Sequence, residues 1–179
     1  MSDNLENKKK ISLLTYTHKY KNYNDYVNFQ LNKTRNKKKQ SLWLGPEWNL
    51  KIKLFKNLFT KNIDLIKDKK NALCLGSRTG QEVVAFKDLG VENAIGIDLH
   101  EFKPYTIKGD IHDLNFEDVT FDLEFTNILD HSIYPHKFAK EIYRTLKKDG
   151  IFILHIQYKV RRQDKYTENI ISSLESIDP

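Results

Sequence analysis

The stretch Asn71-Ala-Leu-Cys-Leu-Gly-Ser-Arg-Thr-Gly80 decides the fold of this chain. Its first five residues form a short apolar run, two glycines bracket the loop that follows, and residues 81–89 read as a helix. Glycine permits a tight turn and a close approach to the main chain. The N–H groups at a helix start favour an anionic or carboxylate group. The stretch therefore predicts a strand, a ligand-binding turn and a helix; a tight turn without a ligand is the alternative.

The same alternation continues toward the C-terminus. Short apolar runs predict strands over residues 94–97, 105–108, 121–126 and 151–156, and Pro135 opens a helix predicted to reach residue 146. A further helix is predicted near residues 167–176. Strands separated by connections of crossover length indicate an α/β fold with a doubly wound, mostly parallel sheet.

Before the decisive stretch the sequence is aromatic and basic. Helical spacing predicts helices over residues 22–34 and 47–67, while the polar residues 1–10 are expected to be disordered. We divide the chain into a basic, partly disordered or helical arm, residues 1–46, and a domain, residues 47–179, with its core at 71–156.

Asp98 ends the second predicted strand, eighteen residues after Gly80. An acid at this place can accept hydrogen bonds from ribose hydroxyls, so the loop is suited to a nucleoside-type cofactor. The Gly-Lys-Ser/Thr of NTPase phosphate loops is missing. The dinucleotide fingerprint is also broken, because Arg78 stands where its middle glycine would be.

In this setting residues 71–156 resemble the core of class I S-adenosylmethionine-dependent methyltransferases, particularly the type 11-like branch, with a Rossmann-like fold. Leu73-Cys-Leu-Gly-Ser-Arg-Thr-Gly80 is similar to their first motif, Gly96-Ile-Asp98 to the second-strand acid, and Gly109-Asp-Ile-His112 to the segment around the adenine. Phe121-Asp-Leu-Glu-Phe-Thr-Asn-Ile-Leu-Asp-His131 resembles the fourth strand and its active-site loop. Leu146-Lys-Lys-Asp-Gly-Ile-Phe-Ile-Leu154 resembles the turn into the fifth strand.

The resemblance implies S-adenosylmethionine as the cofactor and methyl transfer as the activity. The glycine loop would contact the methionine part, Asp98 the ribose, Asp110 the adenine amino group and Asn127 the region of the methyl group, with Ile111 over the adenine. The implied cofactor-binding residues are Gly76, Ser77, Arg78, Thr79, Gly80, Asp98, Leu99, Asp110, Ile111, His112 and Asn127.

The sequence departs from the family pattern in three places. Cys74 replaces the usual first-strand acid and is expected to be an inert buried thiol, and Arg78 replaces the middle glycine. Arg78 could bind the cofactor carboxylate, cap the substrate side or prevent binding. The family's C-terminal hairpin is expected to be reduced or absent, because few residues follow the fifth strand.

His131, with Asp130 beside it, is the candidate catalytic base, since a histidine there could take a proton from the acceptor. A histidine that only lines the loop is the alternative, and Tyr134 and His136 are weaker candidates. No ligand spacing supports a metal site, even at His100 or His112.

Charge is divided unevenly along the chain. Residues 1–70 hold 17 basic and 6 acidic side chains, whereas residues 71–179 hold 13 and 18. A basic patch in the arm could bind nucleic acid or another polyanion; a solvated lysine face or a compositional bias is the alternative. The patch comprises Lys33, Arg35, Lys37, Lys38 and Lys39.

Three functions stay open on these grounds: a methyltransferase for a small molecule or sugar, an RNA or DNA methyltransferase that uses the arm, and a non-catalytic relative of the same fold. No long apolar run predicts a membrane span, and a single cysteine favours a reducing compartment, so we expect a cytoplasmic location. The sequence carries no signal for oligomeric state.

Overall fold

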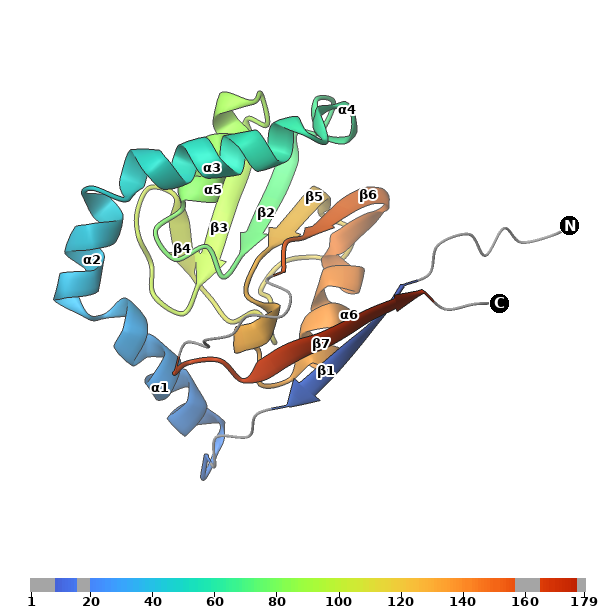
Figure 1. Ribbon diagram of the computed structural model, residues 1–179. Helices are drawn as coiled ribbons and strands as arrows, with labels where there is room; N and C mark the ends of the chain where they lie inside the picture. The colour runs from blue at the N-terminus through green and yellow to red at the C-terminus, as the bar shows by residue number, and fades with distance from the viewer. Residues whose placement is uncertain (1–8, 16–19, 157–164, 177–179) are drawn as a thin grey trace, which may run out of the picture.

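The computed structural model describes residues 9–15, 20–156 and 165–176, and the structural statements below concern these residues. A five-stranded, entirely parallel sheet forms the centre, in the order β4-β3-β2-β5-β6 (Figure 1). Its strands are β2 (Asn71–Leu75), β3 (Asn93–Asp98), β4 (Thr106–Lys108), β5 (Phe121–Thr126) and β6 (Leu146–Leu154). The prediction of a doubly wound α/β fold is confirmed.

Helices cover both faces of this sheet (Figure 1). On one face lie α3 (Trp48–Thr60) and α5 (Gln81–Asp88), whose stacked Phe59 and Phe86 rings have centroids 3.9 Å apart. On the other face α6 (Pro135–Thr145) buries Phe138. Because successive residues of a strand point to opposite faces, Cys74 joins the first core and Leu75 the second.

The turn that the resemblance implies before the fifth strand, around Asp149-Gly150, lies inside β6. Phe121 pairs with Leu146 and Leu123 with Ile151, so β5 advances two residues while β6 advances five. The extra residues form an irregularity in the strand, and pairing begins five residues before the predicted strand start at 151. This difference arises because the turn bulges out while both of its flanks stay hydrogen-bonded to β5.

Three helices precede the sheet: α1 (Tyr23–Thr34), α2 (Lys37–Leu44) and α3, with a single turn, α4 (Ile63–Ile66), after them. The helix predicted over 22–34 is present, whereas the one predicted over 47–67 breaks after Thr60. Sequence periodicity missed α2. Its N-cap is Asn36, whose side chain accepts a hydrogen bond from the Lys39 N–H at 3.1 Å.

The two ends of the chain meet in a second, two-stranded antiparallel sheet. β1 (Lys9–Thr15) pairs with β7 (Asn169–Ser176), from Lys9 opposite Ser176 to Thr15 opposite Asn169 (Figure 1). The helix predicted near 167–176 is therefore wrong, because the β-branched Ile170 and Ile171 belong to a strand whose partner is far away in sequence. Lys9 and Lys10 are also ordered into β1, whereas the rest of the segment predicted to be disordered, residues 1–8, lies outside the described residues.

Within the described part of the chain, no sixth or seventh strand extends the parallel sheet. The C-terminal strand β7 pairs with β1 in a separate sheet, whereas the family pattern would place a hairpin at the edge of the parallel sheet. No helix in the described ranges is both long and apolar enough to cross a membrane.

Candidate cofactor and active site

A cavity opens at the carboxyl ends of β2, β3, β4 and β5, which is where parallel α/β sheets bind ligands. The cavity itself has a volume of about 70 Å³, and the space rises to about 590 Å³ when its opening to solvent is included. The sheet side is lined by Gly76, Arg78, Asp98, Leu99, Gly109, Asp110, Ile111, Ile128 and His131, and the α1 side by Tyr26, Gln30, Lys33 and Thr34. Six of the eleven predicted cofactor residues thus share one cavity with His131.

The glycine loop passes from β2 into α5 through three residues with positive φ. Gly76 has φ +74° and Gly80 has φ +85°, and a Cβ at Gly76 would lie 2.4 Å from the Ile128 side chain. Between them Arg78 has φ +50°, the left-handed conformation that the family pattern assigns to glycine. The loop therefore keeps the turn that the motif predicts, although a side chain occupies the middle position.

The Arg78 side chain turns toward α2, where its guanidinium carbon lies 4.3 Å from the centroid of the Trp43 ring. Stacking of this kind stabilises a guanidinium without requiring a carboxylate partner. The Arg78 main-chain N–H donates to Asp98 Oδ2 at 2.9 Å, which joins the loop to the end of β3. Arg78 both lines the cavity and helps to hold the Asp98 carboxylate in place.

Asp98 also accepts a hydrogen bond from the His100 N–H at 3.3 Å. Burial raises the pKa of Asp98, and this effect outweighs the main-chain hydrogen bonds and the Arg78 charge that favour the carboxylate. A partly buried carboxyl with two fixed donors is held in one orientation at the cavity, as an acceptor for ligand hydroxyls requires.

Asp110 follows β4 and is held by two neighbours. Its Oδ2 accepts from the Tyr23 hydroxyl of α1 at 2.6 Å, and its Oδ1 accepts from the His112 N–H at 2.9 Å and lies 3.0 Å from His112 Nδ1. Burial alone would raise the pKa of Asp110, but the hydrogen bonds from His112 and Tyr23 hold it below the usual range. Asp110 therefore stays an ionised acceptor at the cavity wall.

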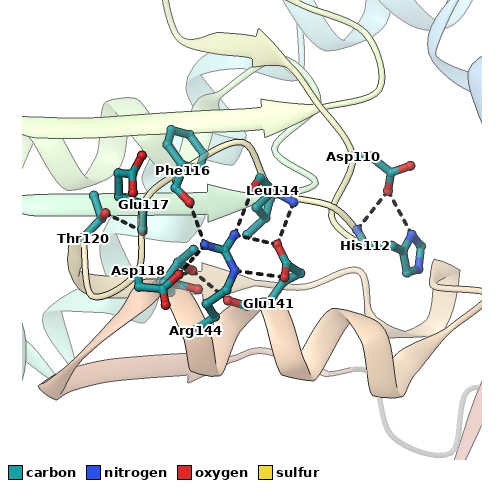
Figure 2. A network of polar contacts seen from close by, with 11 residues as sticks. Asp110, His112, Leu114, Phe116, Glu117, Asp118, Thr120, Glu141 and Arg144 are labelled. Carbon is teal, nitrogen blue, oxygen red and sulfur yellow. Dashed lines mark hydrogen bonds and ion pairs between the residues drawn. The ribbon is translucent and has the colours of Figure 1, made fainter.

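The loop that carries Asp110 is fastened to α6 by a cluster that the sequence analysis missed (Figure 2). Arg144 donates to the carbonyl oxygens of Leu114 and Phe116, at 2.8 and 2.7 Å, and pairs with Glu141 and with Asp118. Glu141 in turn accepts from the Leu114 N–H at 2.7 Å. The helical spacing of Glu141 and Arg144 gave only a weak sequence signal, because an i,i+3 ion pair is common on exposed helices.

His131 lies after β5 in a short 3-10 helix (Leu129–His131). Its Nδ1 lies 2.8 Å from the Tyr166 carbonyl oxygen, and its Nε2 lies 3.3 Å from Lys33 Nζ and 3.8 Å from Asp130 Oδ2. A carbonyl can only accept, so Nδ1 carries the proton and the Nε2 of the neutral ring carries the lone pair. The Tyr26 hydroxyl donates to the His131 carbonyl at 2.9 Å, which ties this segment to α1.

The remaining predicted cofactor residues lie outside the cavity lining. Ser77 and Thr79 are buried beneath the loop, where Ser77 Oγ is 2.9 Å from Thr106 Oγ1 and the Thr79 hydroxyl donates to Gln81 at 2.6 Å. His112 is sequestered next to Ser132 Oγ, 2.8 Å from its Nε2. Gly80 and Asn127 also do not line the cavity.

The predicted basic patch divides between two environments. Lys33 lines the cavity, and Lys39 Nζ lies 5.3 Å from the centroid of the Tyr166 ring, where Lys165 Nζ also lies at 5.0 Å. In contrast, Lys37 donates to Gln40 on the exposed side of α2. Part of the patch therefore belongs to the mouth of the cavity.

Two buried acidic or thiol groups lie beneath the loop. Burial raises the pKa of the Cys74 thiol well above its usual value and the pKa of Glu82 to about 7. Elsewhere in the described residues, no three histidine, cysteine, aspartate or glutamate side chains come together as a metal site.

Comparison with known proteins agrees with this geometry. A family model described as a methyltransferase domain matches residues 73–154. No curated protein matches the chain.

Three solved structures share the fold. A protein of Pyrococcus horikoshii aligns with TM-score 0.54 and 23% identity, over 65% of each chain. The YcgJ protein of Bacillus subtilis aligns with TM-score 0.52 and 23% identity, over 58% of this chain and 50% of its own. A SAM dependent methyltransferase of Archaeoglobus fulgidus aligns with TM-score 0.50 and 18% identity, over 56% and 51%.

The alignments thus span between half and two thirds of the length of these structures, and at such identities they establish the fold alone. Residues 73–154 therefore match the methyltransferase domain family, and their strand order and glycine turn give them the class I, Rossmann-like methyltransferase fold.

Proposed function

We propose that this protein binds S-adenosylmethionine, the cofactor that its domain implies, and transfers the methyl group to a small molecule or sugar. One observation carries the proposal: Gly76, Asp98 and Asp110, from three different strand ends, line the same cavity as His131. A fold kept only as a scaffold, with no nucleoside ligand, would not require two oriented carboxyl groups in one cavity.

The chemistry of the lining fits this cofactor. Asp98 offers acceptors for ribose hydroxyls and Asp110 for the adenine amino group, while Leu99 and Ile111 supply apolar surface for the flat base. Arg78 is the cation on the lining beside the glycine loop and is our candidate for the cofactor carboxylate.

When bound, S-adenosylmethionine supplies an electrophilic methyl group and a neutral thioether leaving group. The protein's part is then to position the acceptor and to take its proton. His131 is our candidate for that step because it lines the cavity and its Nε2 carries the lone pair. Lys33 Nζ, 3.3 Å from this nitrogen, would have to give way before Nε2 takes the proton of the acceptor. Asp130, 3.8 Å from the same nitrogen, is proposed to steady the ring once it is charged.

Calorimetric titration with S-adenosylmethionine tests the proposal. The wild-type protein is expected to release or absorb heat on binding, and Asp98→Ala to lose that signal because the ribose acceptor is gone. Asp88→Ala is the matched control, since Asp88 only pairs with Lys56 on the exposed surface. If the wild-type protein is folded and gives no heat, the proposed enzymatic function is contradicted. Binding without methyl transfer to any acceptor would favour the non-catalytic alternative.

A nucleic-acid acceptor is the second candidate, favoured by the three ammonium groups of Lys33, Lys39 and Lys165 around the Tyr166 ring. It predicts binding to a fluorescent RNA or DNA oligonucleotide that weakens steeply between 50 and 200 mM salt, with a loss on the order of a hundredfold or more. Binding that is absent or insensitive to salt would leave the small-molecule acceptor.

We also propose a cytoplasmic location, because the described cysteine is a buried free thiol.

A further inference from the structure

The carboxylate of Asp110 can be counted as a hydrogen-bond acceptor. An ionised carboxylate offers about four acceptor positions, two on each oxygen. The His112 N–H and Nδ1 both lie within 3.0 Å of Oδ1, and the Tyr23 hydroxyl donates to Oδ2 at 2.6 Å. The Tyr134 N–H donates to His112 Nε2 at 3.4 Å, so in the neutral ring the proton is on Nδ1. With this tautomer the protein takes three positions, and one acceptor position, on Oδ2, remains.

Tyr23 is itself held firmly in this place. Its ring lies nearly parallel to that of Tyr134, at 13° and 5.9 Å between centroids, and its hydroxyl is also 2.8 Å from His112 Nδ1. Burial and the hydrogen bond to Asp110 raise the pKa of Tyr23 far above its usual value, so the hydroxyl keeps its proton and stays a donor. The donor of the hydrogen bond to Asp110 Oδ2 therefore comes from α1, which lies outside the residues 73–154 that the family model matches.

We propose that Tyr23 is a positioning residue of the cofactor site: its hydroxyl holds Oδ2 of Asp110 in place and keeps the carboxyl ionised, so that the remaining acceptor position can meet the exocyclic amino group of a nucleoside. The inference rests on the proposed function, because it assumes that a nucleoside cofactor occupies the cavity. A base with a carbonyl in place of the amino group would set an oxygen, which cannot donate, where the amino group donates to the Asp110 carboxylate.

The charge on Asp110 must persist for this selection to work. Its titratable and charged neighbours are Tyr23 and Tyr26 from α1, His112 and Asp113 from its own loop, and Lys137, Lys140 and Glu141 from α6 along the adjoining hollow. The hydrogen bonds of His112 and Tyr23 favour the carboxylate. Removing the Tyr23 hydroxyl should therefore raise the pKa of Asp110. As the pH falls, the carboxylate would then be protonated, and cease to be an ionised acceptor, at a higher pH than in the wild type.

The test measures calorimetric affinities for two unreactive probes, S-adenosylhomocysteine and S-inosylhomocysteine, with the full chain. The wild-type protein is expected to prefer the adenosyl probe. Tyr23→Phe is expected to reduce that preference by about tenfold, the size of one hydrogen bond to a charged group. In Tyr23→Phe the affinity for the adenosyl probe should also begin to fall at a higher pH than in the wild type, which a purely structural role would not produce.

Tyr20→Phe is the matched control, because the Tyr20 hydroxyl also donates to a carboxylate, that of Glu168, at 2.6 Å. Its probe preference should equal that of the wild type, and thermal unfolding followed by circular dichroism should show all variants folded. An unchanged preference in folded Tyr23→Phe, or tighter binding of both probes, would overturn the inference. If the wild-type protein bound neither probe, the proposed function would fail instead.

Discussion

The sheet side and the helix side of the cavity are built in different ways. On the sheet side, turns of a few residues place Gly76, Asp98 and Asp110 at adjacent strand ends. On the helix side, α1 is held by hydrogen bonds between residues 87 to 138 positions apart, such as Tyr23 to Asp110 and Gln30 to Glu168. The first side follows from local conformational rules, whereas the second depends on side chains that meet only in the folded chain.

This contrast predicts that the sheet side carries more of the folding stability. The helix side should contribute less to stability and more to ligand selection, because it adds single hydrogen bonds to a frame that already exists.

Gly76→Ala should produce the largest effect. A Cβ there would lie 2.4 Å from Ile128 at a φ of +74°, so conformational strain and overpacking add to about 3 kcal/mol of lost unfolding free energy. Gly90→Ala is the control, since Gly90 has φ +94° with no atom within 4 Å of a Cβ, and should cost only about 1 kcal/mol. Urea unfolding measures both; equal losses would show that the close contact at the loop has no energetic weight.

Glu124→Gln should change how stability depends on pH. Glu124 is fully buried in β5 with Oε2 unpaired, and burial raises its pKa to about 7. Between its unfolded pKa, near 4.5, and about 7, the folded state holds a proton that the unfolded state has lost, so wild-type stability falls as pH rises through this window.

Glutamine does not titrate, so the variant lacks this decline. The unfolding free energy of the variant minus that of the wild type should therefore be about 2 kcal/mol larger at pH 8 than at pH 4.5. Parallel urea titrations at the two pH values measure the difference. Glu82, with a pKa also raised to about 7, should keep part of the decline in both proteins. Identical pH profiles would mean that Glu124 loses its proton in the folded protein at the same pH as in the unfolded chain, so that burial does not raise its pKa.

Arg144→Ala should detach the Asp110 loop from α6. The Leu114 and Phe116 carbonyl oxygens lose a charged donor, at a cost of about 2 kcal/mol, and cofactor affinity should fall with the order of the loop. Lys56→Ala breaks only the exposed pair with Asp88 and should change stability by less than about 0.5 kcal/mol. Chemical unfolding and calorimetric binding together test the expectation, which would be contradicted if the two variants behaved alike.

Tyr26→Phe should have the smallest effect on stability. The ring stays buried while the hydrogen bond to the His131 carbonyl is lost, which costs about 1 kcal/mol. Tyr143→Phe, at a ring that is 86% exposed, is the neutral control. A stability loss as large as that of Gly76→Ala would show that the helix side is as important to folding as the sheet side.

Much of the fold could be read from the sequence because its signals are local. The apolar run before Gly76, the glycines of the turn and the bounds of β5 all matched the structure. The failures were long-range. The strand β7 was read as a helix because its partner β1 lies at the other end of the chain, and α2 was missed because its apolar pattern is weak.

The candidate site shows the same division. Asp98 and Asp110 were found because a motif marks the ends of their strands, and they share the cavity with His131. Ser77 and Thr79 were predicted to bind the cofactor with the rest of the loop, but both side chains are buried beneath it. Tyr23, Gln30 and Arg144 carry no motif, so only their contacts identify them.

The sequence by itself determined the parallel α/β sheet and the glycine turn after its first strand, because hydrophobic periodicity and glycine conformation act over a few residues. The tertiary structure alone decided which side chains close the cavity. It brought α1 against Asp110 and His131, turned Arg78 onto Trp43, and joined the two chain ends in a separate sheet. Those choices depend on which buried polar groups find partners across the fold, and hydrogen bonds between distant residues leave no periodic trace in a sequence.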